Sequence, residues 1–596
     1  MKKKHEKAEL IFRFLKGSKK YFAMAVAASF ITTILNALIP QIFRFTVDSV
    51  LEGKEHRWLS EHLWTIAGFL ICVAILSGAA LFVSRLYTAK AGENFAKNMR
   101  DSLFTHVQRL PVKWHDRHQT GDIIQRCTSD VEVIRNFVVT QLLEVFRTVF
   151  LIAVSFSIML SMNVKLSMLV LIFVPVVAAY SVIFYRLIAK KFTWADEAEG
   201  ELSTVVQENA TGVRVVRAFG REMFEMERFH EKNNAFANLW IKLGTMSGLY
   251  WGTGDFITGL QVIAVIVFGA IEAVHGELSV GEFIAFASYN TTLVWPVRGL
   301  GRILSEMSKA GVSFERVNYI LAASEEEYGE EKETKTEDER SCEEQFDIEF
   351  AHVDFGYNKE KKVLDDVTFT IPQGTTLGIL GGTGSGKSTV IQLLNRLYEL
   401  SEGNGKITIG GRDIREIPLK ELRKKIGIVL QEPFLYSRTI RENICASRPD
   451  ATFEEIREAA KIACVDEAIM NFPDGYETLV GERGVTLSGG QRQRVAIARM
   501  LLQKAPIMIF DDSLSAVDSQ TDSKIRKELA VKCKDATVIL ISHRITTLMG
   551  ADNIMVLNCG RIEEMGTHQE LLDKHGSYKE IYEIQMSQDD RMQVEG

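Results

Sequence analysis

Cysteine and proline are scarce in this sequence of 596 residues, with seven of the first and ten of the second. No two cysteines form a CxxC pair or a metal-ligand spacing, which argues against a disulfide scaffold and a cysteine-based metal site. We interpret them as reduced residues with structural roles; they are Cys72, Cys127, Cys342, Cys445, Cys464, Cys533 and Cys559. The low proline content also excludes a collagen-like chain.

An excess of basic charge is absent as well. The chain has 70 basic and 77 acidic residues, a net charge of -7, so it is not a nucleic-acid binder in bulk. The acidity is local: residues 324–344 hold 11 acidic and 3 basic residues, which leaves a net charge of +1 for the rest. This stretch has few apolar residues and no helical stripe. It predicts a flexible linker over residues 323–346, with an acidic regulatory tail as the alternative.

Long apolar runs without charge are abundant in the first half. A helix needs about 20 apolar residues to cross the hydrocarbon core of a membrane, and six windows reach or approach that length. They are 21–43, 63–84, 148–164, 166–185, 243–271 (interrupted by Asp255) and 283–297. Six such windows in one half of a chain favour membrane spans over buried core helices. The pattern predicts a six-helix transmembrane domain over residues 1–322.

The charges that flank these windows predict the orientation of the domain. The N-terminus is strongly basic, and basic segments stay in the cytoplasm; its lysines are Lys2, Lys3, Lys4, Lys7, Lys19 and Lys20. Six spans return the chain to the same side, so we expect a multi-pass protein of the cell membrane with both termini in the cytoplasm. The long charged segments between spans two and three, and between spans four and five, are then cytosolic loops.

The second half changes to short β-like runs that alternate with helical stretches. Residues 376–380, 507–510 and 537–541 are continuous apolar runs of the kind found in buried parallel strands. The alternation predicts an α/β domain with a parallel sheet over residues 347–596.

A phosphate-binding motif follows the first of these runs. Its backbone N–H groups and the N-terminus of the following helix suit phosphate oxygens. The motif comprises Gly381, Gly382, Thr383, Gly384, Ser385, Gly386, Lys387 and Ser388, and the helix continues at Thr389. The spacing predicts that Lys387 reaches the outer phosphates and that Ser388 holds Mg²⁺. Asp511, at the tip of a second apolar strand, is a further candidate ligand for that Mg²⁺.

Five further residues give these motifs a specific resemblance. Leu487, Ser488, Gly489, Gly490 and Gln491 look like the signature sequence of ATP-binding cassette (ABC) proteins. Together with the P-loop, Asp511 and His543, they make the second half resemble an ABC nucleotide-binding domain. Six spans followed by one cassette resemble the ABC exporter half-transporters of the bacterial multidrug and lipid flippase type. The resemblance implies ATP and Mg²⁺ as cofactors and ATP-driven transport by alternating access.

The family pattern assigns roles to other positions of this chain. Tyr357 matches the aromatic that stacks on adenine, Gln431 the glutamine that contacts Mg²⁺ and the attacking water, and His543 the histidine that contacts the γ-phosphate. Residues 120–131 and 209–219 look like the coupling-helix segments, which dock on the cassettes and transmit motion.

One position departs from the family pattern. The family places a glutamate after the metal-binding aspartate, as the base that activates water, whereas this chain has Asp512. Aspartate is one methylene shorter, and a misplacement of about 1 Å can cost about 10²-fold in rate. Because each ATP lies between the P-loop of one cassette and the signature of the other, an impaired base beside an intact signature predicts a heterodimer. The expected partner is a second half-transporter with glutamate at the equivalent position.

We therefore expect ATP-driven export of amphipathic drugs or lipids, with membrane lipid and a hydrophobic or amphipathic substrate as partners and no nucleic acid. The alternatives are a homodimeric exporter in which Asp512 is a slow base, and a non-transporting ATP-gated sensor. Asp255 has either a specific role within its span or none. The aromatic residues of the last spans are candidates for lining a substrate cavity, or for ordinary packing; they are Trp251, Phe256, Phe286, Tyr289 and Trp295.

Overall fold

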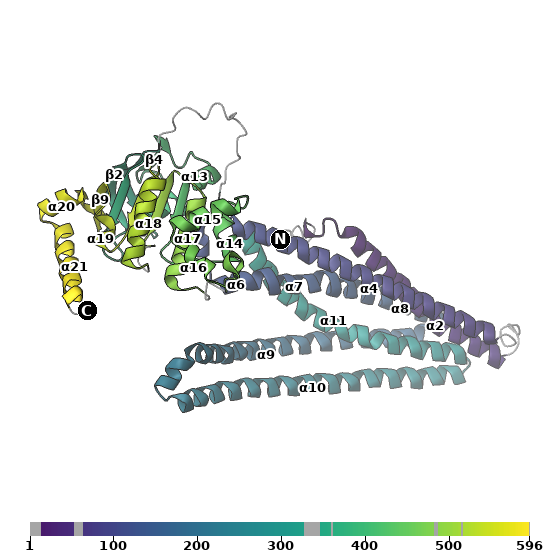
Figure 1. The fold of residues 1–596 in the computed structure, drawn as a ribbon. Helices are drawn as coiled ribbons and strands as arrows, with labels where there is room; N and C mark the ends of the chain where they lie inside the picture. The colour runs from purple at the N-terminus through teal and green to yellow at the C-terminus, as the bar shows by residue number, and fades with distance from the viewer. Residues whose placement is uncertain are drawn as a thin grey trace, which may run out of the picture. The chain divides into compact units, whose positions relative to one another are not determined.

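A computed structural model describes residues 13–52, 63–326, 346–358, 361–481, 487–513 and 517–594 (Figure 1). The basic cluster Lys2–Lys7, Cys342 and nearly all of the predicted acidic linker lie outside these ranges. The six cysteines within them form no disulfide. The chain divides into two compact units, which are described separately. The first comprises Met1–Arg109 and His118–Ser324, and the second comprises Leu110–Arg117 and Glu325–Gly596.

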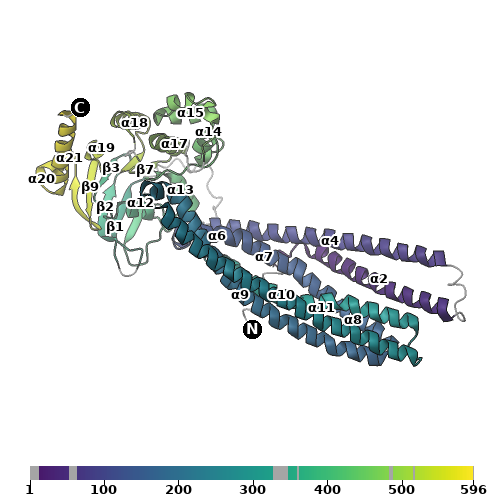
Figure 2. The ribbon, with the colours of Figure 1, turned by 90° about the horizontal axis from the view of Figure 1, so that it is seen from below.

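The first unit is built of long helices. They are α2 (Lys19–Glu52), α4 (Leu63–Gln108), α6 (Thr120–Gln125), α7 (Val131–Arg135), α8 (Leu142–Met162), α9 (Val164–Ala218), α10 (Glu222–Val274) and α11 (Val280–Leu321). The π-helical segments η1 (Arg126–Asp130) and η2 (Asn136–Gln141) join α6, α7 and α8 into one helical run. The helices α9 and α10 run side by side, and α11 packs against α2, α8 and α9 (Figure 2). The predicted helical domain is thus observed.

Five helices among the described residues are long and apolar enough to cross a membrane. They are Lys19–Val50, Trp64–Gln108, Thr120–Met162, Val164–Ala218 and Glu222–Val274. The sixth predicted span, 283–297, lies within α11, where it was also the shortest window in the sequence. Each long helix continues well beyond its apolar window, because the charged segments between the windows are themselves helical. This explains the long polar loops predicted on one side of the membrane.

The helices α9 and α11 approach each other closely at Gly301. A Cβ atom at this position would lie 2.7 Å from the carbonyl carbon and oxygen of Ser181 on α9. Small residues allow such backbone contacts between helices in membranes. Gly301 is therefore required by packing, whereas Gly299 on the same helix has nothing within 4 Å of an added Cβ atom.

Replacing Gly301 with alanine is expected to destabilise the first unit by about 1–3 kcal/mol, because the added methyl group meets backbone and not a movable side chain. The thermal unfolding midpoint of the lipid-reconstituted chain, followed by intrinsic fluorescence, should fall by several degrees. Gly299→Ala is the matched control and should be neutral or slightly stabilising, since alanine is the better helix former. Equal midpoints for the two variants would contradict this account of the α9–α11 contact.

The second unit contains two sheets. An antiparallel sheet has the order β2 (Leu364–Ile371), β1 (Ile348–Phe355), β4 (Lys406–Ile409) and β5 (Arg412–Asp413). The larger sheet has the order β10 (Arg561–Gly566), β9 (Asn553–Asn558), β3 (Thr376–Leu380), β8 (Thr537–Ile541), β7 (Ile507–Asp511) and β6 (Ile426–Val429). Its strands β9, β3, β8, β7 and β6 are parallel to their neighbours, and β10 is an antiparallel edge. The predicted strands 376–380, 507–510 and 537–541 are confirmed as β3, β7 and β8.

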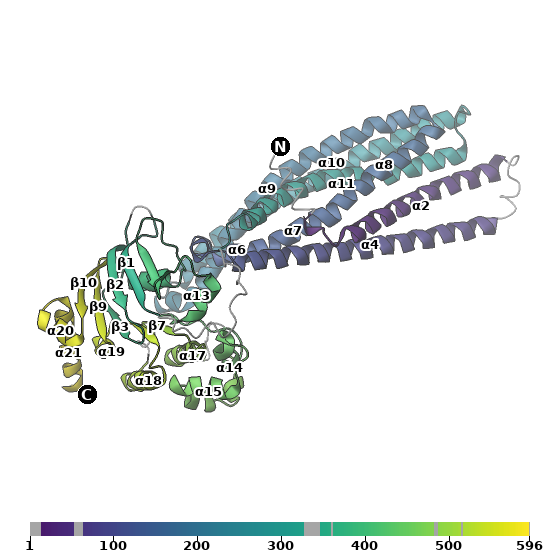
Figure 3. The ribbon, with the colours of Figure 1, turned by 90° about the horizontal axis from the view of Figure 1, so that it is seen from above.

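Both faces of the parallel strands of the larger sheet are buried, which explains why these strands are largely apolar, whereas the edge strand β10 is polar and partly exposed. On β7, Ile507 and Ile509 pack with β1, β2 and β4, whereas Met508 and Phe510 pack with the helices of the other face. Helices α14, α15, α17 and α18 gather on one side of the strands (Figure 3). The helices of this unit are α5 (Val112–His115), α12 (Lys387–Leu394), α13 (Leu419–Lys425), α14 (Ile440–Ile444), α15 (Phe453–Ile462), α16 (Asp466–Met470), α17 (Gly489–Leu502), α18 (Ser519–Lys532), α19 (Ile545–Leu548), α20 (His568–Lys574) and α21 (Ser577–Val594).

Candidate nucleotide site

The phosphate-binding motif occupies the turn between β3 and α12, as predicted. Gly386 is the N-cap of α12 and has φ 103°, in the left-handed region that favours glycine. A Cβ atom on Gly381 would lie 2.3 Å from the carbonyl oxygen of Leu557, so this position also admits only glycine. The Lys387 ammonium donates to the carbonyl oxygens of Gly381 and Gly382 at 2.9 and 2.8 Å. The lysine is thereby held over the loop whose N–H groups suit phosphate.

The residues at the start of α12 and the end of β7 fit a magnesium ion. The Ser388 hydroxyl donates to Oδ1 of Asp511 over 3.5 Å, so a hydroxyl and a carboxylate oxygen share one place. Oxygen donors of this kind, together with phosphates, are the ligands that Mg²⁺ prefers. Burial raises the pKa of Asp511, and burial lowers the pKa of Lys387 against the opposing charges of Asp511 and Asp512. A bound cation would compensate the charge of the Asp511 carboxylate, and a bound phosphate would compensate the charge of the Lys387 ammonium.

Sheet register explains why Gln431 and Asp512 meet. Val429 on β6 is paired with Phe510 on β7, and each of the two polar residues lies two positions beyond its strand residue. The Gln431 side-chain amide donates to Oδ2 of Asp512 over 3.5 Å. Asp512 has φ 46°, and its backbone N–H donates to the carbonyl oxygen of Ile541 at 2.9 Å. The position predicted for the catalytic base therefore lies beside the position predicted to orient water.

The other predicted nucleotide contacts surround this centre. His543 lies two residues beyond the end of β8 and is exposed. Burial raises the pKa of Asp511, and His543 acts in the opposite direction by lowering it. Tyr357 follows β1, and its hydroxyl forms hydrogen bonds with Thr389 and Gln392 of α12. Burial raises the pKa of the Tyr357 hydroxyl. An aromatic ring thus stands beside the first turns of the phosphate-binding helix, where the family pattern places the base of the nucleotide.

The signature residues form a separate, pre-shaped helix start. Ser488 is the N-cap of α17, where its hydroxyl accepts from the Gln491 backbone N–H at 3.3 Å and Gln491 Oε1 accepts from the Ser488 N–H at 2.9 Å. Gly489 and Gly490 form the first turn, and Leu487 is buried beneath it. Within the described part of the chain, no hydrogen bond joins Ser488–Gln491 to the P-loop. The arrangement fits a signature that serves the site of another cassette.

A segment from the first half of the chain belongs to the second unit. Leu110–Arg117, which includes α5, groups with the second unit, and Asp116 accepts a hydrogen bond from the Tyr398 hydroxyl. The segments predicted to dock, 120–131 and 209–219, both group with the first unit instead. Pro111, the N-cap of α5, is the residue that could have indicated this boundary in the sequence, because proline ends the preceding helix and begins a new one.

The Asp116–Tyr398 hydrogen bond predicts how firmly this segment is held. Tyr398→Phe removes the donor, and a hydrogen bond to a charged group contributes about 1.5–3 kcal/mol when buried and less when exposed, as here. The amides of Val112–His115 should therefore exchange with deuterium several-fold faster. Tyr357→Phe is the matched control, because the Tyr357 hydroxyl is bonded to α12 and not to this segment. Equal exchange in wild type and Tyr398→Phe would show that other contacts hold α5.

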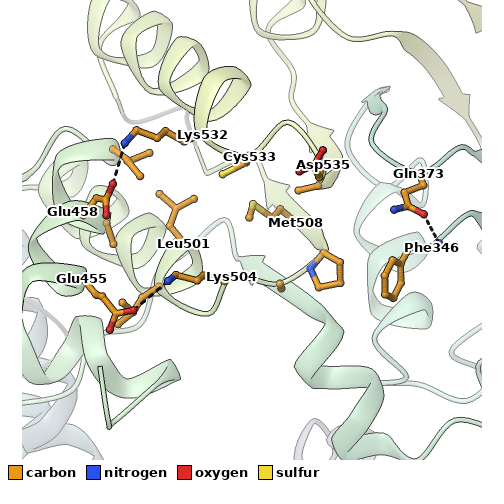
Figure 4. A pocket seen from close by; sticks show the side chains of 16 residues that line it. Phe346, Gln373, Glu455, Glu458, Leu501, Lys504, Met508, Lys532, Cys533 and Asp535 are labelled. Atoms are coloured by element: carbon orange, nitrogen blue, oxygen red, sulfur yellow. Dashed lines mark hydrogen bonds and ion pairs between the residues drawn. The ribbon is translucent and has the colours of Figure 1, made fainter. Parts of the chain in front are cut away.

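A second cavity of about 520 Å³ in the same unit is distinct from the nucleotide site (Figure 4). Pro506 and Ala536, which line it, come directly before β7 and β8, so it lies at the amino ends of these strands. The P-loop and Asp511 lie at the carboxyl ends, where ligands bind in parallel sheets. Two ion pairs, Glu455 with Lys504 and Glu458 with Lys532, flank its apolar wall.

Comparisons with known proteins agree with this arrangement. Residues 22–297 match the family described as ABC transporter transmembrane region, and residues 364–515 match the family described as ABC transporter. The chain is 37% identical to the uncharacterized ABC transporter ATP-binding protein YknU of Bacillus subtilis (strain 168), over 95% of each chain. It is 33% identical to the "Putative multidrug export ATP-binding/permease protein YgaD" of the same strain, over 96% of this chain and 98% of that one.

A solved structure extends the likeness to the whole architecture. The structure of a bacterial Atm1-family ABC exporter with ATP bound superposes with a TM-score of 0.79 and 26% sequence identity, covering 96% of this chain and 99% of the other. The helical domain, the cassette and their order in the chain are therefore shared along nearly the full length. The chain belongs to the ABC transporter family, and it joins a transmembrane domain and an ATP-hydrolysing cassette in the arrangement of an ABC exporter.

Proposed function

We propose that this chain is one half of a heterodimeric exporter that moves amphipathic small molecules, drugs or lipids, across the bacterial cell membrane. The observation that carries the proposal is Asp512, which contacts Gln431 and stands where the family pattern has the catalytic glutamate. The intact, capped signature helix at Ser488 supports a chain that still completes the site of a partner. Relatives named for multidrug export support the substrate class.

The two nucleotide sites of such a dimer do different work. The site built on Lys387, Ser388, Asp511 and Asp512 binds ATP with Mg²⁺ held by Ser388 and Asp511, and turns it over slowly. The site that Ser488–Gln491 completes contains the partner's glutamate and sets the turnover. The closed dimer has the higher affinity for ATP, so nucleotide binding favours closure and release of the products favours opening. This coupling changes the side of the membrane to which the substrate cavity opens.

Export is tested by flux into sealed vesicles. Inside-out vesicles that contain this chain and its partner should accumulate an amphipathic dye when ATP is added outside, and not with a non-hydrolysable analogue. A dye gradient that forms equally without ATP would disprove active export. ATP-dependent conformational change without flux of any dye tested would favour the non-transporting sensor.

The heterodimer is tested by the composition of the native complex. The tagged chain, purified from the membranes of its own cells, should carry a second half-transporter in equal amount, with glutamate aligned to Asp512. Vanadate trapping of labelled ATP should then mark mainly the site that contains this glutamate. Recovery of only this chain, or equal trapping at both sites, would favour a homodimer in which Asp512 is a slow base.

A further inference from the structure

The first unit contains a basic, aromatic-lined cavity of about 240 Å³. Its walls come from α8, α9, α10 and α11, at the ends of the four spans that the predicted topology places at the cytoplasmic side. Three arginines and one glutamate carry its charge, namely Arg147, Arg298, Arg302 and Glu144. Tyr185, Tyr250, Trp251 and Trp295 supply aromatic surface. Of the predicted cavity aromatics, only Trp251 and Trp295 line it, whereas Phe286 and Tyr289 are buried in the helix core.

Arg298 is fixed in the wall by aromatic rings and one carboxylate. Its side chain is only 3% exposed, and its guanidinium carbon lies 5.7, 5.0 and 5.6 Å from the ring centres of Tyr250, Trp251 and Trp295. Its Nη1 is 2.6 Å from Oδ1 of Asp255, which gives this acidic residue of the fifth span a specific partner. Its Nε and Nη2 have no hydrogen-bond partner within the described residues.

After the ion pairs of the cavity wall are counted, the remaining charge is positive. Asp255 neutralises Arg298, and Glu144 forms an ion pair with Arg147 at 2.6 Å. Arg302 is exposed on the wall and forms no ion pair or hydrogen bond with the residues that the structure describes. A guanidinium in a partly water-excluded site binds carboxylate, phosphate or sulfonate through two parallel hydrogen bonds. Arg302 is the residue placed to receive such a group.

The aromatic surface of this cavity does not suit a cation, although aromatic rings often bind one. The ring faces of Tyr250, Trp251 and Trp295 already meet the guanidinium of Arg298, which would repel a second positive charge. The outer parts of Trp251 and Trp295 remain exposed and can pack against an uncharged ring. The volume suits a charged group with one ring system attached, and is smaller than typical drug-sized pockets of about 300–1,000 Å³.

We infer that this cavity binds the charged end of an amphipathic anion, with the anionic group on Arg302 and the adjoining apolar part on Trp251 and Trp295. The inference rests on the proposed export function and gives its substrate class: anionic amphiphiles are recognised and cationic ones are rejected. The anionic group belongs either to a soluble organic anion or to the headgroup of an anionic lipid, because both present the same oxygens.

Two naphthalene ligands test the charge preference, since they differ only in a sulfonate or a trimethylammonium group. Binding is measured by equilibrium dialysis against the full chain in phosphatidylcholine nanodiscs, without nucleotide, after subtraction of empty nanodiscs. The sulfonate should bind at least about tenfold more tightly than the ammonium compound, the ratio given by one charge-assisted contact. Tighter binding of the ammonium compound, or specific binding of neither, would overturn the inference.

Variants at matched positions test the assignment to Arg302. Arg302→Gln should weaken sulfonate binding by about tenfold or more, and Arg302→Lys, which keeps the charge but loses the two parallel hydrogen bonds, should restore only part of it. Arg186→Gln is the control, because Arg186 is exposed just after the fourth predicted span, next to Tyr185, but does not line the cavity. It should bind the sulfonate as wild type does. An equal loss in Arg186→Gln and Arg302→Gln would reduce the effect to general surface charge and overturn the assignment.

Anionic lipid in the nanodisc distinguishes the two sources of the anion. If phosphatidylglycerol competes with the sulfonate in wild type and not in Arg302→Gln, the natural ligand class is an anionic lipid; if it does not compete, the class is a soluble organic anion. Because this measurement uses no ATP, it is independent of the flux experiment. Flux failure with intact, Arg302-dependent binding would disprove export and leave the anion site in place.

Discussion

Replacing Asp512 with glutamate is expected to raise the ATPase rate of the purified chain in lipid by about 10²-fold, the factor associated with a displacement of about 1 Å at a reacting centre. The longer side chain brings the carboxylate outward from the end of β7, past the Gln431 amide that Asp512 contacts at 3.5 Å. The affinity for ATP should stay unchanged, because Lys387 and Ser388, which we propose hold the phosphates and the metal, are not altered.

The backbone conformation at position 512 makes glutamate slightly less favourable for stability than aspartate. Its φ of 46° is a conformation that aspartate tolerates better than most residues, so glutamate there costs a fraction of a kcal/mol in stability. The thermal midpoint of Asp512→Glu should therefore be equal to or slightly below that of wild type while its ATPase rate rises. Faster hydrolysis cannot then be ascribed to a more stable protein.

Asp512→Asn is the matched control, because it keeps the length of the side chain and removes the carboxylate. If wild type is nearly silent, the asparagine variant should be silent as well. The impaired-base interpretation is wrong if wild type alone hydrolyses ATP at about 1 s⁻¹, within the ordinary enzyme range, and Asp512→Asn abolishes this activity. Asp512 would then be a working base and the homodimer a competent exporter.

Lys387→Met should weaken ATP binding at this chain's P-loop by about 10²-fold, because charge-assisted hydrogen bonds to phosphate contribute about 1.5–3 kcal/mol each. The Lys387 ammonium also donates to the carbonyls of Gly381 and Gly382, so the loop loses two internal contacts. Methionine fills the same volume and keeps the helix start of α12 intact. Binding of a fluorescent ATP analogue measures the loss without requiring hydrolysis.

Lys504→Met makes the same charge change in the same domain and serves as the control. Lys504 pairs with Glu455 beside the second cavity, at the amino ends of the strands, and should not affect ATP binding (Figure 4). In an Asp512→Glu background, Lys387→Met should remove the gained ATPase activity and Lys504→Met should not. ATP affinity within about threefold of wild type in Lys387→Met, a difference under about 1 kcal/mol, would contradict the phosphate role of Lys387.

Local motifs made much of the nucleotide site predictable from the sequence. The P-loop fixes both its glycines and the strand and helix on either side, so β3 and α12 were found with it. Asp511 was found because a continuous apolar strand ended in a carboxylate. The contact between Gln431 and Asp512 could not be derived from spacing, since it depends on the pairing of β6 with β7 across about 80 residues of sequence; the family resemblance supplied both positions instead.

Long-range packing limits what a sequence reveals about the remainder. The aromatic residues of the last spans could be named as cavity candidates, but only the fold separates Trp251 and Trp295 from the buried Phe286 and Tyr289. The partner of Asp255 was also hidden, because Arg298 lies 43 positions away on another helix. The grouping of Leu110–Arg117 with the second unit was hidden too, since its hydrogen bond to Tyr398 joins positions far apart in the chain.

The inclusion of Leu110–Arg117 in the second unit has a consequence for biosynthesis. Asp116 and Tyr398 are 282 residues apart, and a ribosome that adds about 5–20 residues per second needs about 14–56 s to pass from one to the other. During that interval α5 has been made and its docking surface has not. A fragment that begins after the linker would have the opposite defect, with a docking surface that no segment covers. The nascent chain must therefore keep this short segment soluble until about two thirds of the protein has been made.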